Sequence, residues 1–502
     1  LGATIGPAGG SLGGPARRRP EGRVVIDESV IGRVLGVALQ TGGEFAEIFA
    51  EDRRGTGARL DDGRVEDLSS GRERGAGIRV VAGDTTGFAH TADLSEAGLV
   101  AAAHAARAAA RSGGGGVRQV ALSTVEAPVP NRFEILPETV GKATKVELLR
   151  RADEAARSGA GRAAAAAGMG QGGAGGSIRQ VSAFYGDSRR RILVANSDGV
   201  LASDDQVKTR FMVSCVALGD TGMQTGRESI GATVGFELFD THQVEEMARA
   251  AAASALTKLA ARPAPSGTLP VVIKAGSGGV LFHEACGHGL EADHIAKDVS
   301  VFAGRVGEMV ASPLVTLVDD GTMGPEWGAL AVDDEGHPAA RNVLISGGVL
   351  TDYMWDWLRA RKEGRPSSGN GRRESYRHLP MVRMTNTFVT NGTEDPDEII
   401  AQTPHGVYVA QLGGGQVNTA TGDFVFGMTE AYLIEGGRIT EPLRDANLIG
   451  NGPQVLANID VVGNDFAMGW PGTCGKQGQG VPVGDGQPTL RVTALTVGGT
   501  AQ

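Results

Sequence analysis

Apolar residues in the first half of the chain recur at helical spacing in some segments and at strand spacing in others. Helical spacing covers residues 31–39, 95–110, 142–157 and 240–261, and strand spacing covers 45–49, 191–194 and 210–217. Ser95 stands where its hydroxyl can cap the second of these helices, and Asp240 with Gln243 forms a capping box for the fourth. We therefore predict a first half that mixes helices with strands.

The second half of the chain consists of short apolar runs that glycines interrupt. Leu344–Leu350 and Leu433–Ile439 both place Gly-Gly between strand-like residues, which predicts two hairpins. Before this half, two prolines in Arg262–Gly267 follow a predicted helix and cannot continue it. We predict a domain boundary there, with domains at 25–262 and 266–502, the second a curved β-sheet or partly closed barrel carrying one important helix.

Length and composition are consistent with two folded domains. At 502 residues the chain exceeds the usual size of a single core. Its 78 glycines have no three-residue period and stand among 41% hydrophobic residues, which excludes collagen and wholesale disorder. Residues 1–24, rich in Gly, Pro and Arg, are predicted to be a disordered tail, and the glycine cluster 168–176 a surface loop.

Charge and cysteine content narrow the class of protein. The net charge is -10, and Arg17–Arg19 is the only notable basic cluster, so nucleic acid is excluded as the main partner. No apolar run approaches the roughly 18 residues of a membrane span, and the order of residues 1–19 is wrong for a signal peptide. Cys215, Cys286 and Cys474 lie far apart in sequence, which favours a reducing compartment, the cytoplasm, and leaves thiols free to bind metal.

The segment His283-Glu284-Ala285-Cys286-Gly287-His288 carries the strongest chemical signal. It follows a predicted strand, Val271–Ile273, and a glycine turn, so we expect a helix. Two imidazoles supply zinc ligands, and Glu284 supplies a base for the bound water. Because residues five apart diverge by about 140° around an α-helix, against about 40° at four apart, we predict a π turn or a break at Gly287 that brings both histidines to one face.

A catalytic zinc needs a third protein ligand, for which the sequence offers Glu291, Asp293, His294 and Cys474. Cys474 is preferred on its chemistry, because its flanking glycines allow close approach of the backbone and Lys476 can hold the sulfur as thiolate. Taken alone, a cysteine in such a segment is more often a small buried residue. Glu291 and Asp293 have an alternative role, in which they orient a histidine ring from behind.

With these residues in hand, the chain resembles the TldD/PmbA family of metalloproteases, in particular the TldD branch that retains the metal motif. The resemblance extends from about Gly43 and is carried most clearly by residues 283–291, 369–376, 413–417 and 475–490. It implies zinc bound by His283, His288 and Cys474, with Glu284 as general base. It also implies an α+β fold, with an α/β amino-terminal domain and a β-rich carboxy-terminal domain. A dimer is implied too, commonly a heterodimer with a PmbA (TldE) subunit, although a homodimer is possible.

Two further segments are candidates for binding the substrate. Gly413 to Gly415, followed by Gln416 and Val417, are predicted either to expose a sheet edge to which an extended peptide adds as a strand, or only to bend the sheet. In the first case Gly414, Gly415, Gln416 and Val417 contact the substrate. Arg372 and Arg373 are predicted either to bind a substrate carboxylate or to organise the cavity wall.

The predicted function is therefore zinc-dependent hydrolysis of unfolded or extended peptides. Two alternatives come from other classes. One is a non-catalytic binding subunit of the topoisomerase-modulator type, against which the intact metal motif argues. The other is a zinc aminopeptidase or amidase acting on small substrates, which the ligand chemistry does not distinguish from a peptidase.

Overall fold

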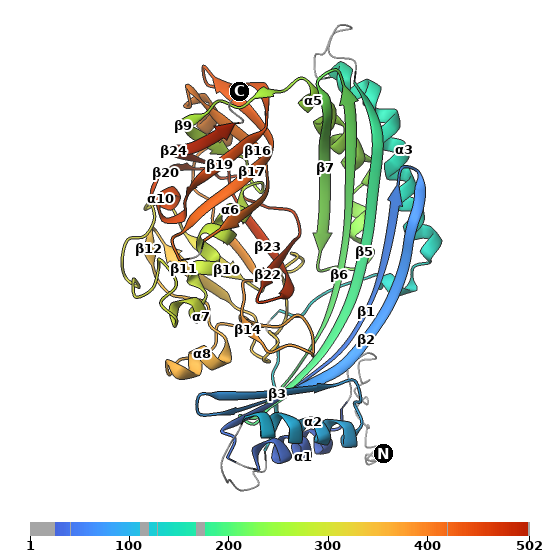
Figure 1. Cartoon of the computed structure of the whole chain (residues 1–502), viewed down its shortest axis with the longest axis vertical. Helices are drawn as coiled ribbons and strands as arrows, with labels where there is room; N and C mark the ends of the chain where they lie inside the picture. The colour runs from blue at the N-terminus through green and yellow to red at the C-terminus, as the bar shows by residue number, and fades with distance from the viewer. Residues whose placement is uncertain are drawn as a thin grey trace, which may run out of the picture.

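The computed structural model describes residues 26–40, 42–110, 120–127, 129–166, 176–418 and 420–499. The predicted tail, 1–24, and residues 168–175 of the glycine cluster lie outside these ranges. Figure 1 shows a long curved sheet built from the first half of the chain, with the second half packed against its inner side.

The first sheet is antiparallel apart from one short parallel strand, and its strands are unusually long. Its strands are β1 (Phe45–Asp61), β2 (Arg64–Ala82), β3 (Thr85–Thr91), β4 (Ser123–Thr124), β5 (Ser177–Asn196), β6 (Val200–Gly219) and β7 (Gly222–Ala232), in the order β3-β2-β1-β5-β6-β4 with β7 beside β6. The strand predicted at 45–49 therefore continues to Asp61. Its polar, glycine-containing second part gave no alternating pattern, but β2 and β5 pair with it on both sides.

Helices cover one face of this sheet. They are α1 (Glu28–Leu39), α2 (Glu96–Ala109), η1 (Pro137–Thr139), α3 (Lys142–Ala166), α4 (Leu238–Thr241) and α5 (Val244–Leu259). Because strand side chains alternate between faces, Ile48 of β1 packs with α1 and α2 at one end, while Leu60 packs with α3 and α5 at the other. Ser95 caps α2 as predicted, through its hydroxyl and the Gly98 amide.

The predicted capping box before α5 is wrong. Asp240 lies inside the separate short helix α4, and α5 begins only at Val244. The two residues between the helices, His242 and Gln243, both have extended backbone angles, and Gln243 makes no side-chain capping bond. The sequence pattern joined two helices that two extended residues separate.

The second half contains a closed barrel and a second sheet. The larger sheet has the order β16-β9-β24-β19-β17-β18-β8. Pairing of β16 with β17 closes five of its strands into a barrel, which confirms the predicted β-rich second half. The strands of this sheet are β8 (Arg262–Pro263), β9 (Gly267–Ile273), β16 (His405–Val417), β17 (Asp423–Glu435), β18 (Arg438–Arg444), β19 (Ala446–Asn451), β20 (Ile459–Val462) and β24 (Leu490–Gly499). Both predicted Gly-Gly hairpins are present, as β11–β12 and β17–β18.

The second sheet has the order β12-β11-β10-β15-β23-β21, and β22 pairs with β23. Its strands are β10 (Leu317–Asp320), β11 (Arg341–Ser346), β12 (Val349–Leu350), β15 (Asn386–Val389), β21 (Ala467–Met468), β22 (Gly472–Lys476) and β23 (Gln479–Gln487). A separate pair consists of β13 (Gly371–Arg372) and β14 (Met381–Val382). The remaining helices are α6 (Gly279–Phe282), η2 (His283–Gly287), η3 (His288–Leu290), α7 (Ala292–Ile295), α8 (Trp357–Lys362), α9 (Pro396–Ala401) and α10 (Gly452–Ala457).

The two halves meet through the other face of β1. Phe45 stacks on Trp357 with ring centroids 3.6 Å apart, and buried Glu47 forms ion pairs with Arg79 and Arg373. The inner face of the first sheet therefore carries the charged residues that hold the second half in place. We propose the division into domains 25–262 and 266–502, with β8 already paired to β18 of the second half.

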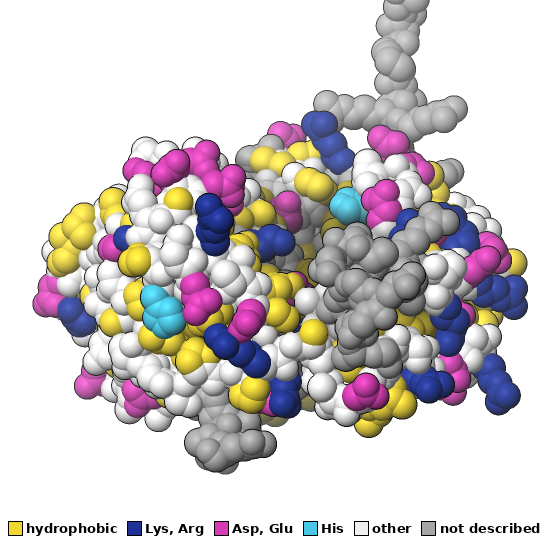
Figure 2. Space-filling view, turned by 90° about the horizontal axis from the view of Figure 1, so that it is seen from above, with side chains coloured by type: hydrophobic (Ala, Val, Ile, Leu, Met, Phe, Trp, Pro, Cys, Tyr) yellow, Lys and Arg dark blue, Asp and Glu magenta, His cyan; other side chains and the backbone are white. Residues whose placement is uncertain are grey.

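The surface gives no sign of a large single-sign patch in the view from above, where basic side chains are scattered among acidic ones (Figure 2). Across the described ranges, no helix combines the length and apolar character that crossing a membrane requires.

Candidate metal centre

The two histidines lie on a π turn, as the five-residue spacing predicted. The helix begins as α6 at Gly279, widens into the π turn η2 from His283 to Gly287, and tightens into η3 at His288. The His288 amide donates to the His283 carbonyl, the bond between residues five apart that defines a π turn. The imidazole centroids are consequently only 5.1 Å apart.

Gly287 lets the turn pack closely on Met384 by its lack of a side chain. A Cβ atom at this position would lie 2.2 Å from the Met384 sulfur, well inside van der Waals contact. The helix thus packs directly on the core of the second half at the point where it widens.

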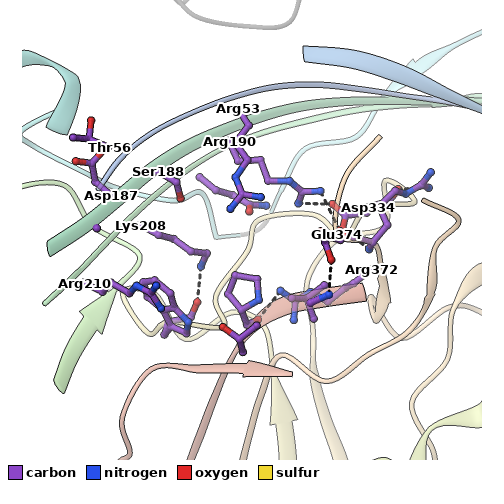
Figure 3. A pocket seen from close by; sticks show the side chains of 18 of the residues that line it. Arg53, Thr56, Asp187, Ser188, Arg190, Lys208, Arg210, Asp334, Arg372 and Glu374 are labelled. Atoms are coloured by element: carbon purple, nitrogen blue, oxygen red, sulfur yellow. Dashed lines mark hydrogen bonds and ion pairs between the residues drawn. The ribbon is translucent and has the colours of Figure 1, made fainter. Parts of the chain in front are cut away.

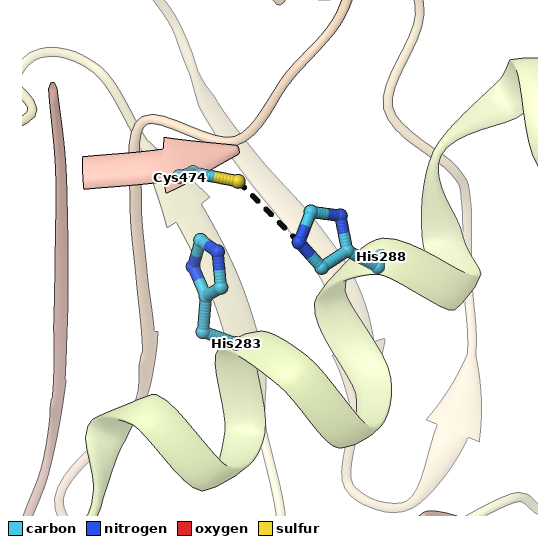
Figure 4. A group of neighbouring side chains, drawn as sticks. All are labelled: His283, His288 and Cys474. Carbon is cyan, nitrogen blue, oxygen red and sulfur yellow. Dashed lines mark hydrogen bonds between the residues drawn. The ribbon is translucent and has the colours of Figure 1, made fainter. Parts of the chain in front are cut away.

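Cys474 approaches the histidines from strand β22 (Figure 4). Its Sγ lies 3.3 Å from His288 Nε2, and donor atoms of His283, His288 and Cys474 all lie within 4.8 Å of one another. All three residues are buried. Arg383 holds the strand from behind by donating to the Cys474 carbonyl.

Electrostatics favour the thiolate form of Cys474. Burial by itself raises the pKa of this thiol, but hydrogen bonds with His283 and His288 outweigh burial and lower the pKa to about 4. Burial raises the pKa of Cys286, and it raises the pKa of Cys215 to about 12. Both thiols therefore stay protonated. Of the three cysteines, Cys474 therefore has the chemistry of a metal ligand.

Glu291 orients His288, which was the alternative role foreseen for it. Its carboxylate lies 3.0 Å from His288 Nδ1, leaving Nε2 directed at the sulfur. Burial raises the pKa of Glu291, but the charges of His288 and Lys476 outweigh burial and lower it to about 2. His294 Nδ1 contacts the His288 carbonyl at 2.9 Å.

The expectation that Lys476 holds the sulfur is wrong. Its ammonium group donates to Glu291 at 2.9 Å, to Asp293 at 2.7 Å and to the Val382 carbonyl at 3.1 Å, which uses all three protons. Residues 474 and 476 do face the same side of β22, but two buried carboxylates attract the ammonium more strongly than the thiolate does. Glu291, Asp293 and His294 also cluster within 4.8 Å, and their contacts place them around His288 and Lys476.

Glu284 lies beside the candidate metal ligands on the solvent-facing side. Its Oε2 is 3.7 Å from His288 Nε2, and its side chain keeps 28% of its exposure. A carboxylate in this position can contact both a small molecule at the three donor atoms and a substrate arriving from solvent.

Asp485 is a nearby acid that the sequence analysis missed. Burial raises the pKa of Asp485 to about 6; the charge of His283 opposes this shift and that of Glu284 adds to it. Gly279, the first residue of α6, leaves room for it, since a Cβ there would lie 2.4 Å from Asp485 Oδ1. The available signal was its position between Gly484 and Gly486, inside a strand.

Arg372 and Arg373 are buried and engaged with protein groups. Arg372 donates to the Met384 and Pro482 carbonyls. Arg373 pairs with Glu47 of the first sheet. Both nevertheless line a cavity between the two halves.

Strand β16 has one open edge beyond its first residues. It pairs with β17 through Gly415, Gln416 and Val417, but with β9 only from Val407 to Val409. In the portion of the chain that the structure describes, no other strand pairs with β16. Gly414, Gly415 and Gln416 are exposed. The open edge starts beside Leu412, whose amide donates to Ser277 in the turn before the metal-site helix.

These residues fit a zinc ion. Two imidazole nitrogens and a thiolate are a donor set typical of zinc. The 3.3 Å between Cys474 Sγ and His288 Nε2 is close to the ~3.6 Å that separates N and S ligands around tetrahedral zinc. His283 also interacts with the Cys474 side chain, so that all three donor groups face one another.

Comparison with known proteins gives a consistent family match. Models of PmbA/TldA metallopeptidase domain 1, central domain and C-terminal domain match residues 46–110, 135–259 and 266–499. The chain is 39% identical over 464 residues to "Metalloprotease TldD homolog" of Haemophilus influenzae, covering 91% of this chain and 93% of that protein.

Solved structures share the fold. A Thermotoga maritima protein, described as a proposed modulator of a DNA gyrase, superposes with a TM-score of 0.75 at 20% identity, over 94% of this chain and 100% of its own. TldE from Thermococcus kodakarensis superposes with a TM-score of 0.70 at 18% identity, over 94% and 100%.

Proposed function

The chain belongs to the PmbA/TldA metallopeptidase family, and from this premise we propose that it is a zinc-dependent peptidase acting on unfolded or extended peptides. The observation that carries the proposal is the convergence of His283, His288 and Cys474 from a π turn and a distant strand beside the carboxylate of Glu284.

In this proposal His283, His288 and Cys474 hold the ion. When bound, zinc supplies a Lewis acid that acidifies a water and polarises the scissile carbonyl. Glu291 keeps His288 in the required orientation through Nδ1, and Lys476 fixes Glu291 in turn. His288 is therefore held in place before any ion arrives.

Glu284 acts as the general base. Its partly exposed carboxylate takes the proton of the attacking water and passes it to the leaving amine. Asp485, near both Glu284 and His283, adds a second acidic group to the site.

The open edge of β16 is the proposed binding site for the peptide backbone. An extended peptide adds there as a strand, with Gly414, Gly415, Gln416 and Val417 contributing main-chain groups, so many sequences are accepted. The edge begins next to the turn that leads into the metal-site helix, and β16 contacts the π turn. The ion pair of Arg373 with Glu47 favours, for this residue, a role in organising the cavity wall over binding a substrate carboxylate.

The working form is proposed to be a cytoplasmic dimer, either with a TldE-type subunit or with a second copy. The shared fold with TldE supports a partner of similar shape. Light scattering of the chain alone and after co-expression with such a subunit distinguishes the two assemblies.

The test of the proposed function uses Glu284→Gln. We expect zinc content to stay at the wild-type value while cleavage of an unfolded peptide falls by about 10²- to 10⁴-fold. Glu363→Gln, which removes an exposed carboxylate distant in sequence, is the matched control and should leave cleavage unchanged. Undiminished turnover by Glu284→Gln refutes the assigned base.

A second test addresses the β16 edge. Peptides with N-methyl groups on alternate amides cannot form all main-chain hydrogen bonds of a strand, so we expect their affinity for the Glu284→Gln protein to fall several-fold. Equal affinity for methylated and unmethylated peptides contradicts strand addition.

A further inference from the structure

A cavity of about 280 Å³ lies between the inner face of the first sheet and the β22–β23 ribbon. Its wall comes from β1, β5 and β6 on one side and from the second half on the other (Figure 3). Six cationic side chains line it: Arg53, Arg190, Lys208, Arg210, Arg372 and Arg373. The lining acids are three: Asp187, Asp334 and Glu374.

Some of these charges are neutralised within the protein. Arg190 pairs with Glu51 and Asp334 at 2.8 Å each. Asp187 pairs with Lys145 at 2.7 Å, so that its charge is not available to the cavity cations.

Lys208 has no such partner. It is buried, and its ammonium group donates to the Thr233 hydroxyl and to the Trp327 and Ala329 carbonyls, all of which are neutral oxygens. These bonds satisfy its protons, and the charge of Asp204 only partly offsets the effect of burial and the repulsion from Arg372 and Arg190.

Two arginines that line the cavity, Arg210 and Arg372, also have no ion-pair partner among the described residues. Arg372 donates only to the Met384 and Pro482 carbonyls, and Arg210 lies over the Phe184 ring at 4.9 Å. Among the residues that the structure describes, none of Lys208, Arg210 and Arg372 has a carboxylate oxygen within ion-pair distance.

The cations raise the electrostatic potential of one another. Burial lowers the pKa of Lys208 well below its usual value, and the charges of Arg372 and Arg190 lower it further. Burial likewise lowers the pKa of Arg372 to about 10. A negatively charged group in the cavity would relieve this repulsion in a setting where charges are weakly screened.

The cavity is separate from the metal centre although the two share a wall. Thr473 lines the cavity, whereas its neighbour Cys474 and the two histidines of the metal centre do not. An ion at the metal site therefore does not occupy this space.

We propose that the cavity is a second binding site, in which Lys208, Arg210 and Arg372 bind an oxyanion, the carboxylate or phosphate group of a small ligand. Arg210 and Arg372 have guanidinium N–H groups left for charge-assisted hydrogen bonds, and Lys208 adds its positive charge to the wall. This site is independent of the proposed peptidase reaction.

Calorimetric titration of the full, zinc-loaded chain with inorganic phosphate and, separately, with succinate tests the proposal. We expect saturable binding of at least one anion, weakened about fivefold or more by Arg210→Gln and about tenfold or more by Lys208→Met. Arg227→Gln on the adjacent strand β7 removes an exposed arginine outside the cavity and should change binding less than twofold.

Because Lys208→Met removes buried contacts and can impair folding, the exposed Arg210 variant, checked by circular dichroism, carries the test. Binding of phosphate alone assigns a phosphoryl ligand, binding of succinate alone assigns a carboxylate ligand, and binding of both assigns an oxyanion site of broad specificity. Absence of saturable binding, or equal weakening by Arg210→Gln and Arg227→Gln, overturns the proposal.

Discussion

Replacing Lys476 with methionine should destabilise the second half of the protein by about 3 kcal/mol at neutral pH. The Lys476 ammonium joins two carboxylates, Glu291 and Asp293, and all three side chains are at most 7% exposed. The pKa of Glu291 falls from 4.5 to about 2, and (4.5 − 2) × ~1.4 kcal/mol corresponds to ~3.5 kcal/mol of net stabilisation of its charged form, to which His288 and Lys476 both contribute. Removing one partner of a buried ion pair costs a similar amount, about 3–5 kcal/mol.

Tryptophan fluorescence during urea unfolding is a suitable assay, because all four tryptophans lie in the second half of the sequence. Arg305→Met is the matched control, since its pair with Glu308 at 2.8 Å is solvent-exposed and should contribute less than about 1 kcal/mol. The folded pKa of Glu291 is depressed, so its contribution is present above about pH 4.5 and is lost as pH falls toward 2. The difference between wild type and Lys476→Met should therefore narrow below pH 4.5.

A loss for Lys476→Met no larger than that for Arg305→Met would refute this account of the ion network. The same conclusion would follow if the difference between wild type and Lys476→Met were independent of pH.

Two further predictions concern the surroundings of the metal site. Gly279→Ala places a Cβ 2.4 Å from Asp485 Oδ1 and should lower both the activity and, by about 1–3 kcal/mol, the free energy of unfolding. Gly414→Ala, with no atom within 4 Å of its Cβ, should change the free energy of unfolding by less than about 0.5 kcal/mol. Comparable losses for the two variants contradict the packing argument. In metal-depleted protein, iodoacetamide should alkylate Cys474 in preference to Cys215, whose pKa is raised to about 12, and zinc should protect Cys474. Peptide mapping by mass spectrometry measures the labelling of both cysteines. Preferential labelling of Cys215 would oppose the assignment of Cys474 as a ligand.

Local chemistry in the sequence predicted the centre of the site better than its surroundings. The five-residue spacing of His283 and His288 required a wide turn, and the structure contains one. Such a requirement follows from helix geometry alone. The hairpins at Gly-Gly and the cap at Ser95 were predictable for the same reason, because each depends on a few adjacent residues.

Features that depend on contacts between distant segments were not predictable. The predicted strand ended at Phe49, yet pairing on both sides extends β1 to Asp61. Lys476 was assigned to the sulfur because it follows Cys474 by two residues, but Glu291 and Asp293, far away in sequence, form its ion pairs. Lys208 gave no sequence signal, since only the fold brings it beside Arg372.

The assignment of His283, His288 and Cys474 as ligands of one ion is tested most directly by an anomalous difference map at the zinc edge, from crystals of the purified chain. The account predicts one peak per chain, about 2.0–2.3 Å from a nitrogen of each histidine and from the Cys474 sulfur. A peak located instead among Glu291, Asp293 and His294, or the absence of any peak in zinc-supplemented crystals, would contradict it.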